Sequence, residues 1–138
     1  MGFPATLMYL DTSAIVAILV DEPERAAFLH KIEEADRLLT SPLSLFETVL
    51  AVLRIINCPT SVAEDESAAF IRRSGARVVD INGAIGTSAI EAYACFGRGR
   101  HKAALNMGDC FAYACAKHRR VPILCKGYDF VHTDIELA

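Results

Sequence analysis

Short apolar runs alternate with longer segments of helical periodicity along the chain, and this alternation constrains the fold more than any other feature of the sequence. We expect buried strands at the short runs, which are residues 7–10, 38–40, 78–81 and 121–125, with a last short strand near 134–137. We expect helices over the longer segments, which are residues 14–20, 24–36, 44–56, 60–73, 83–96 and 109–119. Strands that alternate with helices form right-handed crossovers, so the sequence predicts an α/β fold with a mainly parallel sheet.

The length and charge of the chain narrow the choice further. Its 138 residues suit one domain over 1–138, which is large enough to bury a core without a metal or disulfide staple. Hydrophobic residues make up 53% and the mean hydropathy is +0.30, which favours a parallel sheet covered on both faces. The net charge of −3 argues against binding nucleic acid by bulk positive charge, but it leaves room for a local basic patch.

The cysteines and the apolar N-terminal run indicate a cytoplasmic protein. The five cysteines are an odd number and form no C-x-x-C pair, which is typical of small hydrophobic residues in a reducing compartment. The apolar run over 7–20 is interrupted by Asp11, follows no basic residues and is too short to cross a bilayer. We therefore expect neither a signal peptide nor a membrane partner.

Four acids stand in apolar surroundings, whereas most of the others lie in polar clusters. Asp11 follows the first strand, Glu47 lies within an apolar helix, Asp109 begins a helix and Asp129 follows the strand 121–125. Taken singly, Asp11 and Asp109 are explained as helix caps, Glu47 as an edge charge and Asp129 as a turn residue. Taken together, they converge at the carboxyl ends of parallel strands, where oxygen ligands suit Mg²⁺ or Mn²⁺ and phosphodiester hydrolysis.

Four segments resemble the PIN-domain ribonucleases, and specifically the VapC toxins of bacterial toxin–antitoxin pairs. They are YLDTSA at 9–14, SLFE at 44–47, LNMGDCFAYA at 105–114 and KGYDFVHTDI at 126–135. The resemblance spans essentially the whole chain. It implies a three-layer α/β/α sandwich with a mainly parallel central sheet of about five strands. It also implies a metal-dependent endoribonuclease that acts on RNA, a homodimer, and a cognate VapB-type antitoxin that blocks the site and is the only link to DNA.

The same resemblance assigns the metal ligands. By match, Asp11, Glu47 and Asp109 correspond to the three core acids that hold Mg²⁺ or Mn²⁺. The family often has two adjacent acids before the phenylalanine, and Tyr128 occupies the first of these positions here. We therefore expect Asp129 to be the fourth acid, with Asp134 as the second choice, and the occupancy of a second metal site stays open.

Several neighbours of these acids have two readings. Thr12 and Ser13 either contact a phosphate, a water or a carboxylate, or they cap the following helix. Asn106 either orients Asp109 or contacts the substrate, or it is a turn residue. A basic loop either clamps the RNA backbone or is simply solvated, and its candidate RNA-binding residues are Arg98, Arg100 and Lys102.

Two other functions fit parts of the sequence. An aspartyl phosphatase would use Asp11 as its nucleophile, but this class calls for a second Asp where Ser13 stands. A non-catalytic module would bind an antitoxin-like partner on the helices 44–56 and 84–96 and regulate DNA as a complex. The RNA that a nuclease of this kind cuts is not readable from these residues, because its specificity lies in loops and shape.

Overall fold

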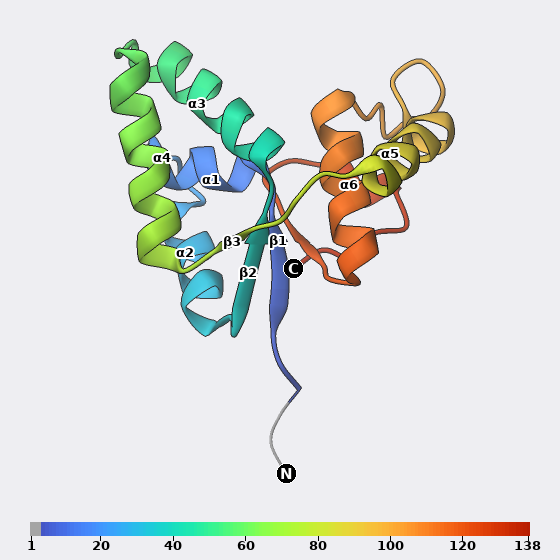
Figure 1. Ribbon diagram of the computed structural model, residues 1–138, viewed down its shortest axis with the longest axis horizontal. Coiled ribbons are helices and arrows are strands. Elements are labelled where there is room, and N and C mark those ends of the chain that lie inside the picture. The colour runs from blue at the N-terminus through green and yellow to red at the C-terminus, as the bar shows by residue number, and fades with distance from the viewer. Residues whose placement is uncertain (1–3) are drawn as a thin grey trace.

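A computed structural model describes residues 4–138, and its centre is a four-stranded sheet (Figure 1). The strands are β1 (Leu7–Leu10), β2 (Arg37–Thr40), β3 (Arg77–Val78) and β4 (Ile123–Leu124), in the spatial order β3-β2-β1-β4. All three pairings are parallel, and Tyr9 on β1 lies opposite Leu39 on β2 and Ile123 on β4. The parallel α/β class expected from the sequence is confirmed.

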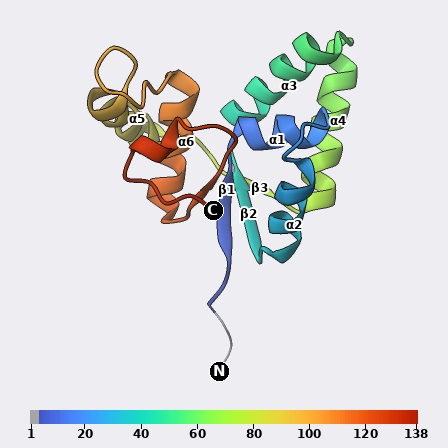
Figure 2. The ribbon, with the colours of Figure 1, turned by 180° about the vertical axis from the view of Figure 1, so that it is seen from behind.

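Helices cover both faces of this sheet, so the three-layer α/β/α arrangement is also confirmed. Figures 1 and 2 show α1 to α4 on one side and α5 and α6 on the other. The helices are α1 (Thr12–Leu19), α2 (Arg25–Glu34), α3 (Pro42–Ile56), α4 (Thr60–Ser74), α5 (Gly83–Phe96), α6 (Met107–Arg119) and a short 3₁₀ helix, η1 (Phe130–His132). Within residues 4–138, no helix combines the length and apolar character that a membrane span requires.

The central strands are buried on both faces because successive side chains point in opposite directions. On β1, Met8 and Leu10 enter the core beneath α1, α2 and α4, whereas Tyr9 enters the core formed with α5 and α6. On β2, Leu38 and Leu39 divide in the same way. This double burial explains why the strands appear in the sequence as continuous apolar runs.

Three local expectations are corrected by the structure. The segment 134–137 forms only an isolated bridge between Leu137 and Ile123, so the sheet has four strands rather than about five. The strand expected over 78–81 is β3, which is confined to Arg77–Val78 and followed by one more ladder bond, from Val79 N–H to Thr40 O at 2.8 Å. The helix expected over 24–36 ends at Glu34, because the next residues turn so that the Asp36 N–H donates to the Thr6 carbonyl at 2.8 Å.

Candidate functional site

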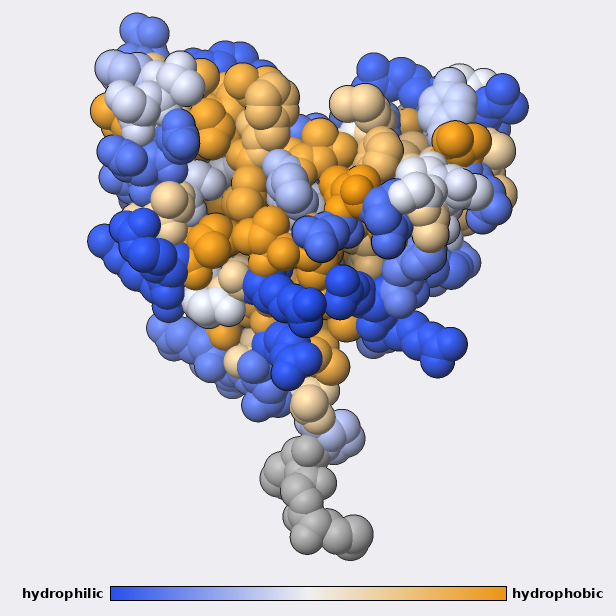
Figure 3. Space-filling view, in the orientation of Figure 1, coloured by the Kyte–Doolittle hydropathy of each residue, from blue (hydrophilic) through white to orange (hydrophobic). Residues whose placement is uncertain are grey.

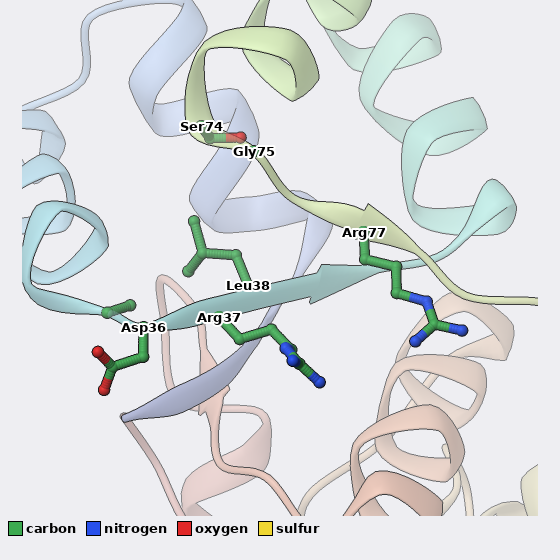
Figure 4. A pocket seen from close by; sticks show the side chains of 7 residues that line it. Asp36, Arg37, Leu38, Ser74, Gly75 and Arg77 are labelled. Atoms are coloured by element: carbon green, nitrogen blue, oxygen red, sulfur yellow. The ribbon is translucent and has the colours of Figure 1, made fainter. Parts of the chain in front are cut away.

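A cavity at the carboxyl ends of the parallel strands collects the four acids that stood out in the sequence. Its volume is about 270 Å³, and Asp11, Glu47, Asp109 and Asp129 all line it. Another hollow, of about 370 Å³, lies at the opposite end of the strands, where Arg37 and Arg77 begin β2 and β3 (Figure 4). Ligands of parallel α/β sheets bind beyond the carboxyl ends of the strands, so the acidic cavity is the candidate site.

Asp11 lies at the junction of β1 and α1 and is the most enclosed of the four acids, with 7% of its surface exposed. It caps α1, because its carboxylate accepts hydrogen bonds from the Ser13 N–H at 3.1 Å and the Ser13 hydroxyl at 2.6 Å. The cap is therefore Asp11 itself, not Thr12 or Ser13. Burial raises the pKa of the Asp11 carboxyl, and the negative charge of Asp129 adds to the rise.

Glu47 reaches the cavity from the second turn of α3. The Thr12 hydroxyl donates to its carboxylate at 3.1 Å, which ties α3 to the start of α1. Below it, the buried Tyr9 hydroxyl lies 2.8 Å from the hydroxyls of both Ser41 and Ser44, and so orients the first turn of α3. Burial raises the pKa of Glu47, and the charge of Asp11 contributes to the rise.

Asp109 is held by a capping box at the start of α6. The Asn106 side chain accepts from the Asp109 N–H at 2.8 Å, and the Asp109 carboxylate accepts from the Asn106 N–H at 3.1 Å. The cap residue is thus Asn106, with Asp109 at the third helical position. Burial raises the pKa of Asp109 to about 7, and the charges of the three other acids contribute to the rise.

The structure separates the two candidates for the fourth acid. Asp129 lies at the exposed turn before η1 and lines the cavity. Asp134 instead accepts a hydrogen bond from the Tyr113 hydroxyl and pairs with Lys117 on α6. These contacts place Asp134 at a hollow between α5 and α6, away from the other acids. Asp129 therefore lies with the other three acids of the cavity, whereas Asp134 holds the C-terminal segment against α6.

The chain is similar to known proteins over nearly its whole length. The family model described as "PIN domain" matches residues 8–136. Ribonuclease VapC30 of Mycobacterium tuberculosis is 39% identical over 128 residues, which cover 93% of this chain and 95% of the relative. This chain belongs to the PIN-domain family of VapC ribonucleases.

Three solved structures share the fold of this family member. The crystal structure of M. tuberculosis VapC20, a sarcin–ricin loop cleaving toxin, superposes with a TM-score of 0.77 at 15% identity and covers 95% of this chain and 98% of VapC20. VapBC2 of Rickettsia felis, bound to a promoter DNA fragment, gives 0.74 at 12% identity, covering 96% and 98%. A toxin–antitoxin complex of Klebsiella pneumoniae gives 0.70 at 13% identity, covering 95% and 96%. At such low identities, the likeness supports the fold alone.

Two cations on the wall of this PIN-domain cavity did not stand out in the sequence. Lys126 forms ion pairs with Glu22 and Glu24, and its backbone N–H donates to the Ser13 hydroxyl at 2.9 Å. Ser13 thereby links the loop after β4 to Asp11. Arg54 lines the cavity from α3, seven residues after Glu47. That spacing of two helical turns on one helix is the signal that would have found it.

The basic loop proposed as an RNA clamp lies apart from the cavity. Arg98, Arg100 and Lys102 are exposed on the loop between α5 and α6, and none of them lines the acidic site. Arg100 lies over the Tyr93 ring, with its guanidinium carbon 5.5 Å from the ring centroid. A role of this loop in binding RNA stays a prediction.

The donors in the cavity suit a hard divalent cation. Among residues 4–138, no three acid, histidine or cysteine side chains meet tightly enough to hold an ion as they stand. Mg²⁺ keeps several of its waters and takes only one or two carboxylates directly, so it does not require such a tight cage. Burial raises the pKa values of Asp11, Glu47 and Asp109, the charges of neighbouring acids add to the rise, and a bound cation would favour their ionised forms.

Proposed function

We propose that this chain is a metal-dependent endoribonuclease toxin that hydrolyses RNA phosphodiester bonds in the cytoplasm. The observation that carries the proposal is the convergence of Asp11, Glu47, Asp109 and Asp129 on one cavity at the carboxyl ends of the strands. The names of its relatives support it, since VapC30 is a ribonuclease and VapC20 is a cleaving toxin. The family also favours a nuclease over an aspartyl phosphatase that uses Asp11.

The residues have separable roles in this proposal. Asp11, Glu47 and Asp109 would hold Mg²⁺ or Mn²⁺, directly or through water, and Asp129 would complete the site or hold a second ion. When bound, the ion supplies an activated water for attack on phosphorus and offsets charge on the leaving oxygen. Ser13, Thr12 and Asn106 each donate a hydrogen bond to one of the acids, and so keep the carboxylates oriented.

The first test is cleavage by the purified protein. We expect it to cut RNA in Mg²⁺ or Mn²⁺, to stop in EDTA and to resume when excess Mn²⁺ is restored, because the acids alone cannot activate water at neutral pH. Cleavage that continues in EDTA would contradict the metal requirement. A metal-loaded protein that cuts no RNA would favour the alternative, a non-catalytic antitoxin partner.

We propose that Arg54 contacts the RNA backbone beside the metal. Arg54 is exposed on the cavity wall, and within the described part of the chain it forms no salt bridge. Lys126, the other cation on this wall, is already neutralised by Glu22 and Glu24. An arginine is suited to a phosphate because its planar guanidinium donates two parallel hydrogen bonds.

Changing Arg54 to Ala should weaken RNA binding. It should also make the negative slope of log K against log salt shallower by about one, which is the signature of one lost phosphate contact. The measurement is fluorescence anisotropy of a labelled RNA in a D109N background, in which cleavage is blocked. The matched comparison is R98A/R100A, which tests the basic loop in the same assay. An unchanged salt slope in R54A together with a shallower slope in R98A/R100A would show that the basic loop, not Arg54, contacts the RNA backbone.

We also propose that the chain pairs with a VapB-type antitoxin and forms a homodimer, with DNA bound only through the antitoxin. The Klebsiella complex pairs a toxin with an antitoxin, and the Rickettsia VapBC2 complex is bound to promoter DNA. Large apolar side chains are exposed on the two groups of helices that flank the site, α1 to α4 on one side and α5 and α6 on the other. They include Phe46 on α3 and Met107 on α6. Figure 3 shows apolar residues gathered in the hollow between these two groups of helices, a surface suited to a partner.

A further inference from the structure

Gly108 occupies a position in α6 that its backbone conformation does not explain. It is the second helical residue, between the cap residue Asn106 and the ligand candidate Asp109. Within residues 4–138, the glycines with positive φ are Gly75, Gly99 and Gly127, so Gly108 needs no special φ. Glycine is about 1 kcal/mol worse than alanine in a helix interior. A reason other than backbone conformation must therefore account for a glycine here.

The space around Gly108 supplies that reason. A Cβ atom built on Gly108 would overlap the Glu47 carboxylate, meeting both oxygens and the carboxyl carbon at less than any normal contact distance. Gly108 is itself buried, so the Glu47 carboxylate lies directly against the first turn of α6. By contrast, a Cβ on Gly86 in α5 would meet no atom within 4 Å. Among the described glycines, Gly97 shows a similar overlap, but with Tyr93 of the helix that it ends, so Gly108 is the one that lies against a cavity acid.

We propose that Gly108 is a positioning residue for the metal site, and this inference rests on the proposed function. Its missing side chain leaves the room in which the Glu47 carboxylate lies next to Asp109, although the two acids come from different helices. The N-terminal turn of a helix also favours a negative charge placed against it. Gly108 thus brings Glu47 close to Asp109 without touching the ion or the substrate.

A substitution at Gly108 should separate function from stability. The group in the way is the far end of a flexible side chain, so the fold can accept a methyl group if Glu47 rotates out of the cavity. The G108A variant should then fold about as well as the natural protein, because the better helix propensity of alanine offsets the loss of the hydrogen bond from Thr12 to Glu47. The same rotation removes one carboxylate from the metal, so ion affinity should fall.

The test is Mn²⁺ binding to metal-free protein by isothermal titration calorimetry, with thermal unfolding in EDTA. We expect G108A to bind Mn²⁺ about 10- to 100-fold more weakly, the usual cost of disturbing the support of a metal ligand, with no loss of melting temperature. G86A is the matched control, and it should bind Mn²⁺ as the natural protein does. In an E47D background the shorter side chain avoids the clash, so adding G108A should cost little more affinity.

Two outcomes would overturn the inference: unchanged Mn²⁺ affinity in G108A, or a melting temperature in EDTA that falls along with the affinity. Failure of the proposed function would look different, because the natural protein itself would then bind no Mn²⁺ and cut no RNA. In that case a crystal structure of metal-free G108A still shows whether a methyl group at position 108 displaces the Glu47 carboxylate. Glu47 displaced from α6 supports it, and Glu47 in its original place refutes it.

Discussion

Replacing Asp109 by Asn should abolish RNA cleavage and leave the fold intact. The amide oxygen of Asn can still accept the Asn106 N–H, so the capping box that begins α6 survives. The negative charge that would hold the cation is lost. Loss of a residue that merely supports a metal ligand costs 10- to 100-fold, so we expect kcat/KM in Mn²⁺ to fall by more than about 100-fold. Asp11→Asn should behave alike, because its amide oxygen still accepts the Ser13 N–H.

The controls for this prediction also decide the fourth acid. Asp129→Asn should lower kcat/KM, because Asp129 lines the cavity, whereas Asp134→Asn should leave it within about two-fold. Circular dichroism and melting temperature would show that each variant is folded. If D109N and D11N retain cleavage, the carboxylate site is wrong. A loss in D134N as large as that in D129N would return the fourth acid to position 134.

In EDTA, the protein should be more stable at pH 5.5 than at pH 8. Burial raises the pKa of Asp109 from an ordinary value of 3.8 to about 7. Between these two values the folded state holds a proton that the unfolded chain has released, so the free energy of unfolding falls as the pH rises. Asp11 and Glu47 act in the same direction. Thermal unfolding at the two pH values should show a melting temperature higher by several degrees at pH 5.5.

Two comparisons test the cause. D109N should reduce the change of melting temperature between pH 5.5 and pH 8. At pH 8 in EDTA it should melt at a higher temperature than the natural protein, because it removes one of four crowded charges at the expense of function. Saturating Mn²⁺ should stabilise the natural protein most at pH 8, where the carboxylates are ionised. Asp134, whose pKa is lowered by Lys117, acts in the opposite direction but only at lower pH. A melting temperature that rises from pH 5.5 to pH 8 in EDTA would contradict this account.

The sequence predicted the parts of the fold that depend on local patterns. Asp11 stands out because a charged residue directly follows a buried apolar run, and chain topology brings it to the carboxyl edge of the sheet. Glu47 stands out because it interrupts an apolar helix. The same local patterns failed at the sheet margins: 134–137 alternates like a strand but has only one bridge, and β3 is confined to two residues. Strand length depends on a partner that the segment itself does not reveal.

Other features of the site depend on contacts between distant segments, and no local pattern could supply them. The choice between Asp129 and Asp134 depends on Tyr113 and Lys117, which draw Asp134 to another face of α6. The role proposed for Gly108 depends on a carboxylate that arrives from a different helix. Asp129, Asp134 and Gly108 all lie in segments that carry the family resemblance. The family resemblance marks these segments, whereas the contacts between them place each residue in space.

The hydrogen bond from the Lys126 N–H to the Ser13 hydroxyl joins residues 113 positions apart. It closes the cavity with β4, which pairs with β1 in the sheet, and four residues separate the end of β4 from the turn at Asp129. Asp11, Glu47 and Asp109 all precede this closing segment in the chain. A nascent or prematurely terminated chain therefore lacks a finished cavity.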